Sequence, residues 1–236
     1  MRNCFELNRA LTRLDSADQV ARFVAENVRS FNAVNVATAC HLLAKMQPLA
    51  RRRNSEMQSR GRPPACGEGG DTRQAIPALL ARASVTVDSF EPQGVANLMW
   101  ALATLGVEPG AELATAMSRR AVASAGEFKQ QEVANLMWAL AVFSFEDQAY
   151  RTLWADAISH LVTVLGRIPG HSPGLDGPAN QAFYCQLHQV LLCMTLEGFL
   201  PGLDLAGQLG SDMVRLFRQT FEGSAVSSSK LQVRAY

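Results

Sequence analysis

A segment of nine residues occurs twice in this chain, 38 residues apart. Val-Ala-Asn-Leu-Met-Trp-Ala-Leu-Ala spans 95–103 and returns at 133–141, an offset of 133 − 95 = 38. Self-similarity at a fixed period of this size is typical of stacked supersecondary units, each of which buries its apolar face against the next. The repeat therefore predicts a solenoid, and it favours a long binding surface over a catalytic pocket.

Apolar residues recur with the helical period, and strand-like alternation is absent. The first copy predicts helices over 92–105 and 111–125, and the second begins with a helix over 130–143 that a long amphipathic helix follows. With 48% hydrophobic residues among 236, the chain can bury a sizeable core. We predict an all-α fold, an α-solenoid of stacked helical hairpins with a period of about 38 residues.

A diverged copy precedes the matching pair. Helical spacing predicts helices over 17–29 and 34–46. Aligning 36–44 with 95–103 gives an offset of 95 − 36 = 59, which is one period plus 21 residues. The Arg-, Pro- and Gly-rich stretch 51–71 has that length and is predicted to be an inserted flexible loop.

A second diverged copy follows the pair. Ala182 aligns with Ala134 at an offset of 48, and the Pro- and Gly-rich loop 168–177 supplies the ten extra residues. A last helix is predicted over 203–221. The predicted organisation is a diverged N-terminal helical repeat (1–50), a flexible loop (51–71), two well-matched hairpin repeats (72–167), a loop (168–177), a diverged C-terminal hairpin (178–222) and a loose tail (223–236).

Composition limits the classes of partner and compartment. The net charge of +1 supplies no strong global field, but Arg outnumbers Lys nineteen to three, and the planar guanidinium suits phosphates and bases. A GC-rich genome explains the same preference. Five Cys without a C-x-x-C pair argue against a disulfide framework and favour a reducing compartment. No apolar run approaches membrane-spanning length, so no membrane insertion is expected.

Catalytic and metal-binding motifs are not apparent. The chain contains no phosphate loop, nucleotide fingerprint or nucleophile elbow. Cys185, His188 and Cys193 share one predicted helix, but they lack the second ligand pair that a zinc site needs. We expect no enzyme activity, no metal and no cofactor.

The two matching copies, Gln93–Ala125 and Gln131–Leu165, resemble the octotricopeptide-repeat family, and 31–46 is similar to them. Gln186–Leu192 is similar to the helical segment that precedes an RNA-binding RAP domain in related proteins, although no RAP-domain sequence follows it here. The resemblance implies a protein of mitochondria or chloroplasts that acts in transcript processing, stability or translation. Its implied partners are single-stranded or ribosomal RNA and proteins of an organellar ribonucleoprotein.

If the first helix of each hairpin lines the concave surface, one or two of its side chains per repeat can meet an unstacked base. Polar residues at matching positions of the copies follow one helical face. The base-facing candidates are Lys45, Gln93, Asn97, Thr104, Gln131 and Asn135. The phosphate-binding candidates are Arg51, Arg52, Arg53, Arg119 and Arg120.

Packing explains some of the same residues. Asn97 and Asn135 are identical in the two copies, which favours a scaffold role in which each amide bonds to a backbone group. Trp100 and Trp138 fit packing between repeats better than base stacking. Thr104 stands where the copies differ and is a better candidate for reading a base.

Two classes of function remain open. One is a sequence-specific or sequence-tolerant binder of organellar RNA, which the family resemblance and the Arg preference favour. The other is a structural protein–protein adaptor, for example a helical-repeat subunit of a mitochondrial ribosome, which the near-neutral charge and the many apolar helix positions favour. A positive concave face would support the first, and a neutral apolar one the second.

Overall fold

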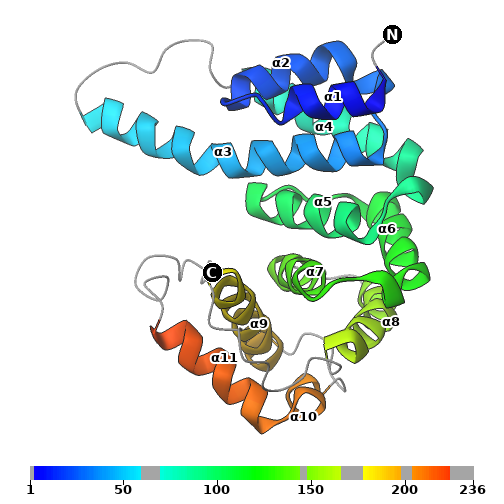
Figure 1. The fold of residues 1–236 in the computed structure, drawn as a ribbon, viewed down its shortest axis with the longest axis vertical. Coiled ribbons are helices and arrows are strands. Elements are labelled where there is room, and N and C mark those ends of the chain that lie inside the picture. The colour runs from blue at the N-terminus through cyan, green and yellow to red at the C-terminus, as the bar shows by residue number, and fades with distance from the viewer. Residues whose placement is uncertain (1–2, 60–69, 144–147, 166–177, 198–203, 224–236) are drawn as a thin grey trace. The chain divides into compact units, whose positions relative to one another are not determined.

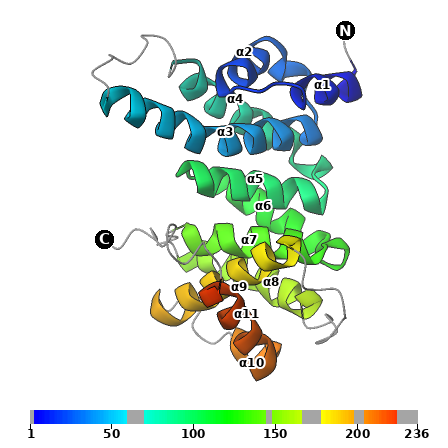
Figure 2. The ribbon, with the colours of Figure 1, turned by 60° about the vertical axis from the view of Figure 1, so that its left-hand side comes forward.

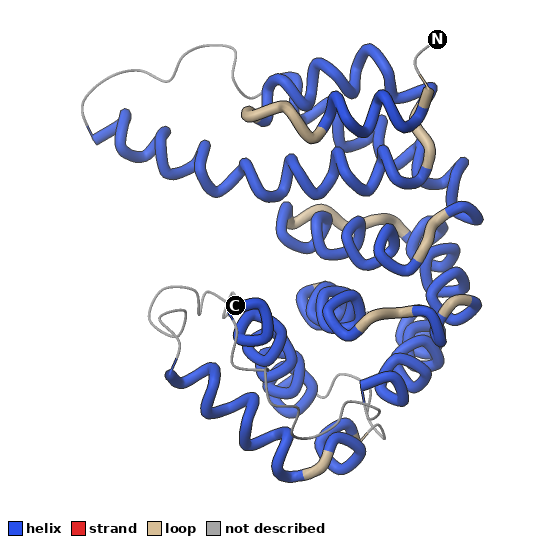
Figure 3. Tube along the Cα trace, in the orientation of Figure 1, coloured by secondary structure: helices blue, strands red, loops and turns tan. Residues whose placement is uncertain are grey.

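Helices make up all the regular structure of the described residues, and no strand occurs among them (Figure 3). The all-α prediction is therefore confirmed. The chain divides into two compact units, Met1–Arg120 and Ala121–Tyr236. The structure is a computed structural model that describes residues 3–59, 70–143, 148–165, 178–197 and 204–223.

The first unit arranges its helices in two layers (Figures 1 and 2). One layer places α3 between α1 and α5, and in the other α2 packs against α4. The boundary between the two units falls inside the helix that follows α5. The helices are α1 (Cys4–Leu11), α2 (Ala17–Asn27), α3 (Ala33–Ser59), α4 (Gly70–Thr86), α5 (Pro92–Leu105) and α6 (Ala111–Ala123).

Helix α1 escaped the sequence-based prediction, although its start carries a clear signal. The Asn3 side chain accepts from the Glu6 backbone N–H at 2.8 Å, and the Glu6 carboxylate accepts from the Asn3 N–H at 3.1 Å. This capping box satisfies two backbone donors that a helix start leaves open. The buried Asn35 amide then donates to the Cys4 carbonyl at 2.9 Å, which ties α1 to α3.

Helix α3 is longer than predicted and runs past the end of α5 (Figures 1 and 2). The predicted loop over 51–71 is wrong for 51–59, because those residues continue α3 to Ser59, and also wrong for Gly70 and Asp71, which begin α4. The stretch 51–59 is rich in Arg, Glu, Met and Gln, which have good helix propensities. Residues 60–69 lie outside the described part of the chain.

A short 3-10 turn precedes α3, α5 and α7, and a buried phenylalanine follows each turn. These residues are Phe31, Phe90 and Phe128. In the first unit an arginine from the second helix after the turn closes it: Nε of Arg82 in α4 donates to the Phe31 carbonyl, and Nε of Arg120 in α6 donates to the Phe90 carbonyl, both at 2.6 Å. The two arginines are one period apart (120 − 82 = 38).

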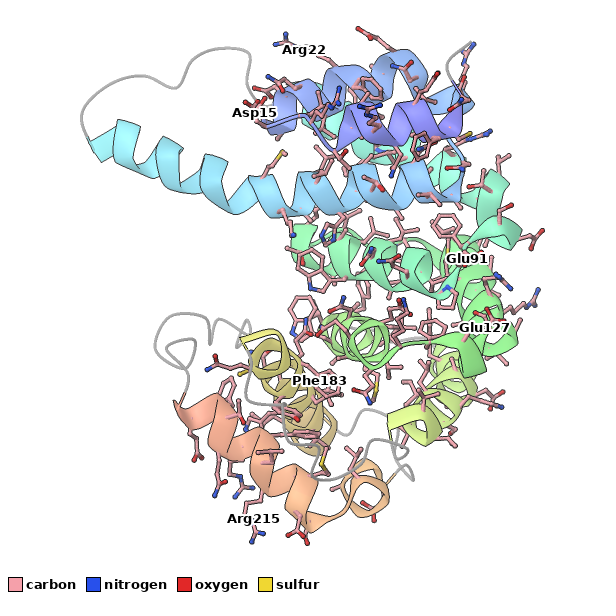
Figure 4. The ribbon with its side chains drawn as sticks, in the orientation of Figure 1. Asp15, Arg22, Glu91, Glu127, Phe183 and Arg215 are labelled. Atoms are coloured by element: carbon pink, nitrogen blue, oxygen red, sulfur yellow. The ribbon has the colours of Figure 1, made fainter. Side chains whose placement is uncertain are left out.

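The second unit is built around α9. This helix packs against α7 and α11, while α8 contacts α7 and α10. Phe183 of α9 (Figure 4) and its neighbour Tyr184 pack on Phe217 of α11, with ring centroids 6.4 and 5.4 Å from the Phe217 ring. The helices are α7 (Gln130–Val142), α8 (Gln148–Leu165), α9 (Pro178–Glu197), α10 (Leu205–Leu209) and α11 (Ser211–Gly223).

The last predicted helix, 203–221, is wrong as a single element. Gly210 has a φ of 82° and separates α10 from α11, so the C-terminal part holds three helices in place of the predicted hairpin. Glycine takes a positive φ without the steric cost that a Cβ imposes. The segments 168–177 and 224–236, predicted as a loop and a tail, lie outside the described residues. No helix among the described residues is long and apolar enough to cross a membrane.

Candidate nucleic-acid interface

Half-buried residues recur at matching positions of α3, α5 and α7. In α5, Asn97 and Trp100 are half-buried, while the pairs of residues between and after them are fully buried. Asn135 and Trp138 show the same pattern in α7. Thr38 and His41 hold the matching positions of α3. These residues therefore share one face of each helix, and that face is only partly covered.

Helix α9 shows the same burial pattern, and this corrects its predicted register. Gln186 and Gln189 are half-buried, and the residues between and after them are buried as in α7. Gln186 therefore matches Asn135, an offset of 186 − 135 = 51 in place of the predicted 48. The two offsets differ by three residues, which is most of one helical turn, so apolar residues of α9 align with apolar residues of α7 at 48 as well as at 51. The sequence alone therefore favours 48, which is wrong.

These positions, with their neighbours at i, i+4, i+7 and i+11, form a stripe along each helix. The stripe of the first unit consists of Val34, Thr38, His41 and Lys45 on α3 and Gln93, Asn97, Trp100 and Thr104 on α5. The stripe of the second unit consists of Gln131, Asn135, Trp138 and Val142 on α7 and Gln186 and Gln189 on α9.

In the first unit the stripe brings two rings together. The His41 and Trp100 ring centroids lie 5.0 Å apart and join α3 to α5. Burial, with a smaller contribution from the Lys45 charge, lowers the pKa of His41, so the imidazole stays neutral at pH 7. Thr104 donates its hydroxyl to the Trp100 carbonyl at 2.8 Å. The exposed Lys45 is the one charged residue of this stripe.

In the second unit the stripe is a network of carboxamides. Nε2 of Gln131 donates to Oδ1 of Asn135 at 3.0 Å and to Oε1 of Gln186 at 2.9 Å. The Trp138 indole N–H donates to Oε1 of Gln189 at 2.9 Å. Two of these three bonds cross from α7 to α9, and the bond between Trp138 and Gln189 joins matching positions of the two helices (189 − 138 = 51). Sequence reasoning missed Gln186 and Gln189 because it placed α9 in the wrong register.

The prediction that the amides of Asn97 and Asn135 bond to backbone groups is wrong. Asn135 bonds to a side chain, and Asn97 makes no side-chain hydrogen bond in the described part of the chain. Both half-buried amides therefore keep hydrogen-bonding groups that no backbone group of the described residues engages. Each tryptophan contacts the neighbouring helix of its own unit, as packing predicts, and remains half-buried.

The predicted phosphate-binding arginines have different environments. Arg119 is exposed on α6, whereas Arg120 is half-buried and its Nε bonds to the Phe90 carbonyl, which makes it a structural residue. Arg51, Arg52 and Arg53 lie in α3, on the part that follows Lys45, and their side chains lie outside the description.

Several charged residues of the described part lie at helix ends, in turns or on exposed helix faces away from the stripes. Glu91, the N-cap of α5, and Glu127, in the turn before α7, are both exposed (Figure 4). Arg215 pairs with Asp212 at 2.7 Å on the surface of α11. Among the described residues no three His, Cys, Asp or Glu side chains gather as metal ligands. Cys185 and His188 are buried in α9, and the side chain of Cys193 is outside the description.

Comparison of the chain with protein-family models, with curated proteins and with solved structures finds no match. The two stripes therefore have to be interpreted from their own chemistry.

Proposed function

We propose that the chain is a helical solenoid that binds single-stranded RNA along the stripes. The observation that carries the proposal is the contact between matching, half-buried positions of neighbouring helices: His41 with Trp100, and Trp138 with Gln189. In a solenoid with a 38-residue period, such positions form a continuous row that an extended ligand can follow. Helical-repeat proteins that recognise RNA bind one base per repeat, and a few side chains contact each base.

The chemistry of the stripes favours contact with bases over contact with the phosphate backbone. Amides, two hydroxyls and aromatic rings make up most of the residues of the stripes, and these groups hydrogen-bond to base edges or stack on base faces. Lys45 is the one charged side chain on them. Beyond Lys45, the sequence of α3 contains Arg51–Arg53, the other phosphate-binding candidates of this helix.

The biological setting proposed for this binder rests on the resemblance to octotricopeptide-repeat proteins. It is a mitochondrion or a chloroplast, and the role is transcript processing, stability or translation without catalysis by this chain. Single-stranded RNA supplies the unpaired bases that amides and rings require.

The test is a binding series with the intact chain and single-stranded RNA at low salt, with Lys45→Glu as the perturbation. Reversing this charge should weaken binding by about fivefold, because it replaces one favourable phosphate contact by a repulsion. Arg29→Glu is the matched control, since Arg29 is exposed in the same unit but lies off the stripe. A folded chain without affinity for RNA at low salt would reject the proposal.

A protein–protein adaptor is the second candidate, and the low charge of the stripes favours it. Two apolar residues of the stripes are well exposed, Val34 at 48% and Val142 at 44%. An adaptor role in a mitochondrial ribosome predicts that the chain co-sediments with ribosomal particles after nuclease treatment. Val142→Asp should then release it, because a charge in an apolar contact is costly.

A further inference from the structure

The carboxamide network of the second unit determines which amide oxygens and NH2 groups of the stripe are already hydrogen-bonded and which are not. The side-chain oxygens of Asn135, Gln186 and Gln189 each accept a hydrogen bond. The amide nitrogen of Gln131 donates to two of them. An amide whose oxygen is engaged keeps its NH2 group available as a donor.

The groups that remain have a definite pattern. The NH2 groups of Asn135, Gln186 and Gln189 make no hydrogen bond within the described part of the chain, and neither does Oε1 of Gln131. Each of these residues is half-buried or exposed, so a ligand can reach it. Asn135 and Gln186, the two residues bonded to Gln131, therefore each place an NH2 donor beside this one acceptor, and the internal bonds hold the amides in this orientation.

We propose that the stripe of the second unit selects uracil in single-stranded RNA, an inference that rests on the proposed function. The Watson–Crick edge of uracil is one N–H flanked by two carbonyl oxygens, so it matches an acceptor with donors on either side. Adenine and cytosine each present an NH2 donor on this edge, which meets donors here and leaves groups unpaired. Guanine carries two donor groups on this edge and needs two acceptors, whereas the stripe offers one.

Trp138 supports the same network from further along the helix. It follows Gln131 by seven residues, two turns along the same side of α7. Its indole N–H donates to Gln189 at 2.9 Å, and this second bond between α7 and α9 helps to hold the two helices at the spacing that the amides require.

The test measures binding of the full chain to oligouridylate, oligoadenylate and oligocytidylate of equal length at low salt. We expect the uridine oligomer to bind tightest. Gln131→Ala should weaken that complex by about fivefold and leave the adenosine complex unchanged, because it removes the acceptor and frees the oxygens of Asn135 and Gln186. Gln186→Glu exchanges a donating NH2 for an accepting oxygen and should also reduce the preference for uridine.

Gln219→Ala is the matched control. Gln219 is exposed on α11, lies off the stripe, and makes no side-chain hydrogen bond in the described residues, so its loss should leave both RNA binding and the base preference intact. Equal affinity of the unmodified chain for all three oligomers would overturn the uracil assignment while RNA binding stands. The same holds if Gln131→Ala, still helical by circular dichroism, keeps the full preference. Absence of binding to any oligomer would instead reject the proposed function.

Discussion

The bond from Arg120 to the Phe90 carbonyl gives the strongest prediction about stability. Its N–O distance is 2.6 Å, and it closes the turn that leads into α5. Phe90 is fully buried, so losing the donor would leave its carbonyl without this partner beside the core. A hydrogen bond to a charged group contributes about 1.5–3 kcal/mol. Arg120 is only half-buried, so solvent screens part of this. We expect Arg120→Met, which keeps the apolar stem, to cost about 2 kcal/mol.

Urea unfolding followed by circular dichroism measures this cost. With a slope of roughly 2 kcal/mol per molar urea, the midpoint should fall by about 1 M. Arg119→Met is the control, because Arg119 is exposed and surface substitutions change stability by less than about 0.5 kcal/mol. Arg82→Met should behave like Arg120→Met, since Arg82 makes the same bond to Phe31. Equal effects of Arg119→Met and Arg120→Met would refute the reasoning.

Three further predictions concern salt, thiol reactivity and pH. If Lys45 and Arg51–Arg53 are the phosphate contacts, log K for single-stranded RNA should fall against log salt with a slope no steeper than about −3, and a slope near −6 would place the contacts elsewhere. Burial raises the pKa of the Cys40 thiol to about 12, so peptide mapping should find Cys40 unalkylated at pH 8 in the folded chain and alkylated in urea. Burial lowers the pKa of His41 below its usual value of 6.5, so the neutral imidazole contributes fully to the free energy of unfolding above pH 6.5, and this contribution is lost as the pH falls below 6.5 toward the pKa of the folded chain. His41→Phe should therefore reduce the dependence of the free energy of unfolding on pH, and an unchanged pH dependence would contradict this assignment.

The bounds of helices were predicted most accurately where the two copies of the repeat agree and the local signals favour the same bounds. Helix α5 was placed correctly at both ends: Pro92 occupies its first turn and Gly106 ends it with a φ of 68°. Helix α7 was placed to within a residue by the repeat itself. In both helices the propensity, the capping and the apolar period agree.

The bonds from Arg82 and Arg120 had a sequence signal that was overlooked. The two residues are one period apart, whereas Phe31 and Phe90 are 59 apart, so the inserted residues fall between Phe31 and Arg82. A charged residue that recurs with the repeat is as informative as an apolar one. The matching residue in the next copy is Ile158 (120 + 38), which is buried, so this closure does not extend to the second unit.

The register of α9 decides which of its residues belong to a binding surface. An offset of 48 would match Gln186 with Trp138 and Gln189 with Ala141, whereas 51 matches Gln189 with Trp138. Three residues rotate a helix by about 300°, so the two choices turn the exposed face by about 60°. The bond between Trp138 and Gln189 joins matching positions only at 51, as the contact of His41 with Trp100 does at 59 in the first unit. Contacts between equal positions of neighbouring helices are what a periodic stack requires. The same packing brings Gln186 beside Gln131 and Gln189 beside Trp138, and the proposed preference for uracil depends on the first of these pairs.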